Sequence, residues 1–279
     1  MTSSPLNPSI DQSSLKPKSQ AWYRPTVSPE HGVYVVLLVS FLIGAAQHWT
    51  WSTTLALLCA FCGFQAEHPL VLQIKQRRSL KPRFLLWGGL YGGLATAIAF
   101  YLYWQQGNLV SPLLWIYLGA IAAFLIDAVS VFYREQKSVL NELITFFAVC
   151  LSASLAYAAT TGTVSTSALG LWLLNGLFFS STIFTVKFRK DKTHAVTPTL
   201  VYHAIASLLV AGLWYIGWLA PLTAIAFGVV LLKLGIVLWQ KDWYCTAKIQ
   251  FIALLETVSA SVFLAIVALS VLPAHLPVP

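Results

Sequence analysis

The sequence predicts an all-α, polytopic membrane protein with about nine transmembrane helices. Two observations predict this class: 58% of the 279 residues are apolar and only 9% are charged, and long apolar runs recur along the chain. Soluble domains are about 45 to 50% apolar with about a quarter of their residues charged. This chain therefore has too little polar surface to cover itself in water, which excludes a soluble enzyme, a disordered regulator and a disulfide-stapled secreted domain.

The apolar runs define the predicted elements. A helix needs about 20 residues to cross about 30 Å of hydrocarbon, and nine runs of that kind follow a polar tail at 1–28. The predicted spans are 32–48, 51–73, 84–104, 110–132, 139–160, 166–186, 197–217, 220–240 and 250–273. We expect the tail to be disordered and cytoplasmic, without a signal-peptide pattern, and residues 29–279 to form a single nine-helix transmembrane domain.

The polar breaks between the spans alternate between neutral and basic. Apart from Lys233, the Lys and Arg residues lie in the tail and in the breaks after the second, fourth, sixth and eighth spans. Because cytoplasmic loops are enriched in Lys and Arg, we expect the N-terminus in the cytoplasm and the C-terminus on the opposite side. The net charge of +8 then faces anionic lipid, and no nucleic-acid partner is indicated.

Ionisable residues inside or at the ends of spans are the functional candidates, because an unpaired charge in the membrane is costly. We expect a polar cavity open to the cytoplasm, with catalytic candidates Glu67, His68, Glu142 and His203. The substrate-binding candidates are His31, Asp127, Asn141, Lys187, Arg189, Lys190 and Tyr202. Snorkelling to the interface is the alternative for acids such as Asp127. Proton relay, metal binding and phosphate binding by the basic loop after the sixth span all stay open.

Two further patterns indicate packing rather than chemistry. Lys233 and Glu256 each lie about eight residues from the nearest cytoplasmic lysine, so they share a depth and are predicted to form a structural ion pair. Four glycines of the third span, Gly88, Gly89, Gly92 and Gly93, make two overlapping small-xxx-small patterns that favour close helix contact.

Several short segments resemble the YwiC-like family of membrane proteins. They are PEHG at 29–32, SVLNEL at 138–143, STIFTVKFRK at 181–190, YHA at 202–204 and the last span with Glu256. The resemblance covers residues 29–273. The family name by itself implies little about function.

A more distant resemblance is to the UbiA superfamily of intramembrane prenyltransferases, carried by the nine spans, the charged loops on one side and the segment 141–162. It implies a lateral apolar cavity and a polyprenyl diphosphate held through Mg²⁺ by two Asp-rich motifs. At those places this chain offers only Glu67 and Asp191, too few carboxylates for the standard site. The cofactor is therefore unassigned, with Mg²⁺ suggested only by the resemblance.

These observations together favour a divergent UbiA-like enzyme that acts on an isoprenoid or quinone-type lipid, with Lys187, Arg189 and Lys190 holding an anionic head. One alternative is a transporter or binder of a small amphiphile. Another is a structural or assembly factor for a membrane complex. Membrane lipid is the expected partner in each case.

Overall fold

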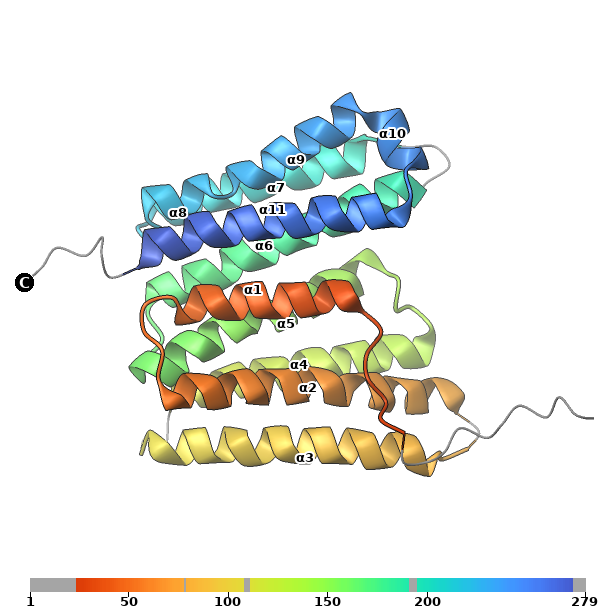
Figure 1. The fold of residues 1–279 in the computed structure, drawn as a ribbon, viewed down its shortest axis with the longest axis vertical. Coiled ribbons are helices and arrows are strands. Elements are labelled where there is room, and N and C mark those ends of the chain that lie inside the picture. The colour runs from red at the N-terminus through yellow and green to blue at the C-terminus, as the bar shows by residue number, and fades with distance from the viewer. Residues whose placement is uncertain (1–23, 78, 108–110, 191–194, 273–279) are drawn as a thin grey trace, which may run out of the picture.

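The computed structural model describes residues 24–77, 79–107, 111–190 and 195–272, and within them the chain is an all-helical bundle (Figure 1). The helices are α1 (His31–Ala45), α2 (Trp51–Gln76), α3 (Pro82–Gln105), α4 (Pro112–Tyr133), α5 (Val139–Thr161), α6 (Thr166–Lys190), α7 (Thr197–Tyr215), α8 (Pro221–Ile225), α9 (Gly228–Trp239), α10 (Lys241–Thr246) and α11 (Ile249–Val271). The predicted all-α class is confirmed. Most of the predicted tail, residues 1–23, lies outside the described residues.

The lengths and surfaces of the helices are those of a protein that crosses a membrane several times. In the described part of the chain, eight helical stretches are long and apolar enough to span a bilayer, with α8 and α9 together counted as one. The first predicted span, α1, is shorter at 15 residues, about 22 Å at 1.5 Å per residue. Large apolar side chains cover the outside, among them Trp104, Leu208 and Trp239 at 73%, 74% and 85% exposed. Such a surface requires lipid, so the protein is an integral, multi-pass membrane protein.

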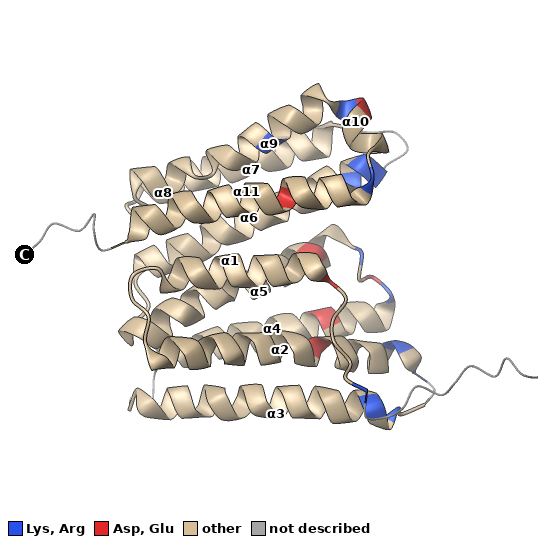
Figure 2. Ribbon diagram, viewed as in Figure 1, with Lys and Arg blue, Asp and Glu red and all other residues tan. Residues whose placement is uncertain are grey.

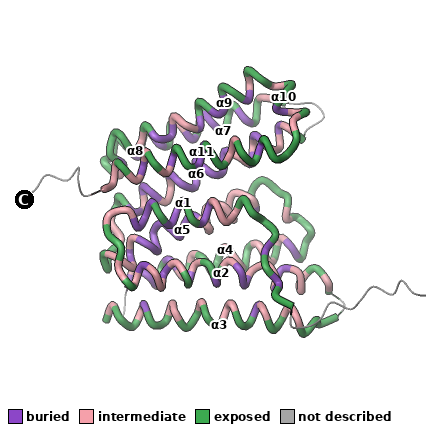
Figure 3. The backbone as a smooth tube through the Cα atoms, viewed as in Figure 1, coloured by how far each residue is buried: buried purple, intermediate pink, exposed green. Residues whose placement is uncertain are grey.

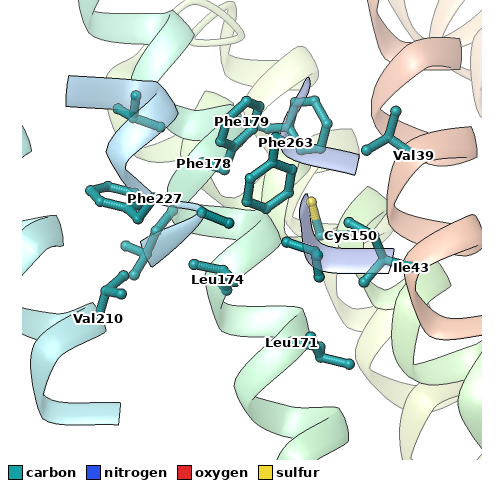
Figure 4. Packing of buried hydrophobic residues seen from close by; sticks show 14 of the residues in the cluster. Val39, Ile43, Cys150, Leu171, Leu174, Phe178, Phe179, Val210, Phe227 and Phe263 are labelled. Carbon is teal, nitrogen blue, oxygen red and sulfur yellow. The ribbon is translucent and has the colours of Figure 1, made fainter. Parts of the chain in front are cut away.

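Helix α6 lies at the centre of the bundle and α3 at its edge. Fourteen residues of α6 are buried, against two of α3, and the difference is visible along the two helices in Figure 3. Helices α1 to α5 form one side of the bundle and α7 to α11 the other (Figure 1). The main apolar core joins the two sides around α6 (Figure 4), where the rings of Phe178 and Phe263 stack with their centroids 3.9 Å apart.

Glycine allows the central helices to approach closely. A Cβ atom added at Gly44 in α1 would lie 2.0 Å from the carbonyl oxygen of Ala153 in α5. One added at Gly176 in α6 would lie 2.4 Å from the ring of Phe147 in α5. Each distance is far below van der Waals contact, so only glycine fits at these crossings.

The glycines of α3 are used for packing only in part. Gly88 and Gly92 face side chains of α2, whereas a Cβ at Gly89 or Gly93 would meet no atom within 4 Å. One of the two predicted small-xxx-small patterns therefore contacts a helix and the other faces outward.

The eighth predicted span is not one continuous helix. Between α8 and α9 the amides of Val229 and Val230 donate to the carbonyl oxygens of Ala226 and Phe227, at 3.1 and 2.9 Å. These are three-residue steps, which tighten the helix locally. This tight turn spans Gly228, and glycine weakens a regular α-helix.

The expectation of a basic loop directly after the sixth span is wrong for Lys187, Arg189 and Lys190. These residues form the last turn of α6, which runs four residues beyond the predicted end. Positive side chains are favoured in the last turn of a helix because they face the negative end of its dipole. Asp191, at the second predicted carboxylate position, lies outside the described residues.

Apart from Lys233 on α9, the described Lys and Arg residues gather at one end of the bundle, and α11 ends at the opposite one (Figure 2). Most of the acidic residues lie near the same charged end. Between the two ends, the described helices therefore carry few charged residues. Among these are Lys233 and Glu256, which form an ion pair.

We predict that Gly44→Ala destabilises the bundle, because the added methyl group collides with the backbone at Ala153. Overpacking of this kind costs roughly 1 to 3 kcal/mol, which should lower the thermal unfolding midpoint measured by tryptophan fluorescence in detergent. Gly89→Ala is the matched control, since its Cβ meets open space, and it should leave the midpoint unchanged. Equal midpoints for both variants would contradict the close α1–α5 contact.

Candidate functional site

The chain before α1 is tied to α2 by a closed ring of hydrogen bonds. The amide of Ser28 donates to Gln65 Oε1 (3.2 Å), Gln65 Nε2 donates to the hydroxyl of Tyr34 (2.6 Å), and that hydroxyl donates to the carbonyl oxygen of Ser28 (2.9 Å). Gln65 is 1% exposed. The ring fixes Glu30 and His31, both exposed, at the start of α1. Gln65 is not among the residues predicted from the sequence, although a Gln in an apolar run is a usable signal.

Three acidic side chains lie near one another at the charged end of α1, α2 and α4. Glu67 is partly buried, and both Asp127 and Glu30 repel its carboxylate electrostatically. The neighbouring His68 interacts with Glu30 and Lys75. Glu67 therefore lies beside two like charges.

Asn141 connects this acidic group to α5. Its Nδ2 donates to Asp127 Oδ1 at 2.8 Å and to the carbonyl oxygen of Gln136 at 3.3 Å. The side chain is 4% exposed, and its Oδ1 has no hydrogen-bond partner among the described residues. Ser138 caps α5 by accepting from the amide of Asn141 at 3.3 Å, which sets the position of the side chain.

The basic turn at the end of α6 is engaged by protein partners. Lys187 Nζ lies 3.0 Å from Glu142 Oε2 and donates to the carbonyl oxygen of Lys137 at 2.8 Å. The guanidinium of Arg189 donates to the carbonyl oxygens of Tyr244, at 3.0 Å, and Ala247. Of the three predicted anion-binding residues, two are thus used to join helices, and Lys190 is exposed at the end of α6.

A second polar group lies on the other side of the bundle, between α6, α9 and α11. Lys233 Nζ lies 2.8 Å from Glu256 Oε2 and also donates to the hydroxyls of Ser181 (3.2 Å) and Thr182 (3.4 Å). Thr182 in turn donates to the same carboxylate oxygen at 2.8 Å. Lys233 is 1% exposed, and all three of its N–H donors have an acceptor. The two hydroxyls, which belong to the run Ser180–Thr182, are not among the residues predicted from the sequence.

His203 and Tyr202 on α7 belong to this second group and not to the acidic one. The ring of His203 is buried, its Nδ1 lies 2.6 Å from the carbonyl oxygen of Thr199, and it interacts electrostatically with Lys233 and Glu256. The Tyr202 hydroxyl donates to the carbonyl oxygen of Leu177 at 2.7 Å. The structure thus divides the predicted site residues between two places. In neither place do three His, Cys, Asp or Glu side chains of the described chain converge closely enough to hold a metal ion.

An apolar groove of about 520 Å³ lies between α4, α5 and α6. Trp115 and Gly119 line it from α4, Phe147 and Leu151 from α5, and Trp172 from α6. Trp115 is 65% exposed, so the groove reaches the outer surface of the bundle. Trp172 donates its indole N–H to the carbonyl oxygen of Phe147 at 2.8 Å, which leaves the groove wall apolar.

The groove approaches the acidic group at its charged end. Its lining on α4 ends at Ile126, directly before Asp127, and its lining on α5 begins at Ile144, one turn after Asn141. Since Asp127 and Asn141 are hydrogen-bonded to each other, they connect α4 and α5 just beyond the apolar lining of the groove.

Fold and site define a helical, multi-pass membrane protein with a lateral apolar groove and two separate polar groups. In a comparison with protein families, the family described as YwiC-like protein matches residues 27–157. The match covers α1 to α4 and most of α5, and it confirms the predicted resemblance for this part of the chain. None of the curated proteins matches. The matched segment contains Glu67, Asp127 and Asn141, whereas Lys233 and Glu256 lie outside it.

We predict that Lys233→Met and Glu256→Leu each destabilise the protein strongly, whereas the double variant is more stable than at least one of them. Removing one partner of a buried pair leaves an uncompensated charge and costs about 3 to 5 kcal/mol, but replacing both by apolar side chains is often neutral. Thermal unfolding of the three variants in detergent measures the difference. Lys190→Met, at an exposed lysine of the charged end of the bundle, is the control. Strictly additive losses in the double variant would argue against the pairing.

Proposed function

We propose that the protein binds a lipid-like amphiphile of isoprenoid or quinone type in the groove between α4, α5 and α6. One observation carries the proposal: the groove measures about 520 Å³ and is lined by aromatic and aliphatic side chains. Sites for small molecules have volumes of about 300 to 1,000 Å³ and mostly apolar walls.

The shape of the groove favours an elongated ligand. On α4 its lining extends from Pro112 to Ile126, about 21 Å at 1.5 Å per residue. A hydrocarbon chain would lie along Trp115 and Trp172, and the polar head would reach Asp127 at the charged end. The groove therefore offers an amphiphile an apolar wall for its tail and a polar boundary for its head.

If the protein is an enzyme, it would catalyse a reaction of the bound lipid. A UbiA-like diphosphate transfer would need carboxylates for Mg²⁺ and free cations for phosphate. Glu67 is the carboxylate available at the first motif position, and Glu142, Lys187 and Arg189 are engaged with protein partners. The geometry thus supports binding or transport of the amphiphile more directly than prenyl transfer, and the UbiA-like relationship stays a prediction.

We predict that Gly119→Leu lowers the amount of copurified isoprenoid or quinone-type lipid roughly tenfold, equal to about 1.4 kcal/mol of binding free energy. The new side chain would enter the groove beside Leu151. Native mass spectrometry and lipid extraction of the purified protein measure the bound lipid.

Gly93→Leu on α3 is the matched control, because it makes the same change on an outward face with no atom within 4 Å. It should retain lipid as the wild type does. If the wild type copurifies without lipid and takes up none on incubation, the groove does not bind an amphiphile. A structural or assembly role then becomes the better account.

We also propose that the charged end of the bundle faces the cytoplasm, because basic residues are retained there during insertion. Alkaline phosphatase fused after residue 279 should then be active, and green fluorescent protein fused at the same place should be dark. Fusions before residue 1 should give the reverse result. A fluorescent C-terminal fusion would invert the proposed orientation.

A further inference from the structure

The polar boundary of the groove presents hydrogen-bond acceptors. Asp127 Oδ1 already accepts from Asn141, and the Oδ1 of Asn141 is buried without a partner among the described residues. A buried amide oxygen without a donor is costly. This oxygen belongs to a side chain that is 4% exposed and fixed by two hydrogen bonds, so it is a preformed acceptor next to the end of the groove.

Three carboxylates lie near this boundary. Asp127 and Glu30 both act on Glu67 as like charges. A phosphate placed here would be repelled, whereas a hydroxyl or ammonium group would be attracted.

Two of the cations at this end of the bundle, Lys187 and Arg77, are engaged by protein partners. Lys187 is paired with Glu142. Arg77 donates to the carbonyl oxygen of Phe132, and its guanidinium lies over the Phe132 ring, 4.6 Å from the centroid. Turning either cation toward a ligand would break these contacts.

Building on the proposed lipid-binding function, we propose that the groove selects amphiphiles whose head is a hydrogen-bond donor without negative charge, a hydroxyl or an ammonium, and rejects phosphorylated heads. Asn141 Oδ1 accepts one hydrogen bond from the head, and the carboxylates of Asp127 and Glu67 stabilise it electrostatically. An ammonium head gains from both carboxylates, and a hydroxyl head gains mainly from the hydrogen bond.

The test compares three ligands with the same tail: geranylgeraniol, geranylgeranylamine and geranylgeranyl diphosphate, the last with and without Mg²⁺. Each is incubated with delipidated full-length protein, and bound ligand is counted by native mass spectrometry. We expect the alcohol and the amine to bind at least tenfold better than the diphosphate. Gly119→Leu should remove the binding of the alcohol and the amine, since the shared tail would lie in the groove.

Substitutions at the boundary assign the preference to named residues. Glu67→Gln and Asp127→Asn keep the side-chain shape and remove a charge, so each should weaken the amine several-fold and the alcohol less. Glu135→Gln, at an exposed acid of the same bundle end, should change neither. If one of the two variants does not fold, the other still carries the test.

The outcomes separate this inference from the proposed function. Tighter binding of the diphosphate that is lost in Gly119→Leu would overturn the head-group selection and keep lipid binding in the groove. Equal binding of all three ligands would also overturn the selection. Failure of every ligand to bind would overturn both.

Discussion

A polar group enclosed by hydrocarbon needs a partner, and this constraint organises the whole bundle. Nearly all charges are placed at one end, where water and lipid heads solvate them. The exception inside the bundle, Lys233, is satisfied on all three donors by Glu256, Ser181 and Thr182. That group is internally neutral, although Glu256 Oε1 has no hydrogen-bond partner among the described residues. The acidic group around Glu67 has no such paired cation among its three carboxylates within the described chain, and this is why the proposals on ligand binding centre on it.

The spans themselves could be predicted from the sequence, because a run of about 20 apolar residues has few alternatives to a membrane helix. The third span, expected at 84–104, is Pro82–Gln105 in the structure. Local departures had weaker signals. The break before Gly228 lies in a strongly apolar run, and the last turn of α6 is made of residues such as Lys187 whose charge suggested a loop.

For the polar residues, the sequence could predict their depth along the helices but not which of them contact each other. Counting residues from the charged end placed Lys233 and Glu256 at one level, and the two side chains meet at 2.8 Å. The sequence also predicted one polar cavity for His203 and Glu67, yet these residues lie on helices on opposite sides of α6. Depth follows from position along a helix, whereas neighbours depend on which helices pack together. For the same reason the groove beside Gly119 could not be located from sequence.

Helix α6 makes the two polar groups mechanically dependent on each other. Thr182, which contacts Glu256, and Lys187, which contacts Glu142, are five residues apart on this helix, about 7.5 Å along its axis. Trp172 on the same helix forms a wall of the groove. An axial slide or rotation of α6 as a rigid rod would therefore strain the buried ion-pair network, loosen the tie to α5 and change the width of the groove in a single movement.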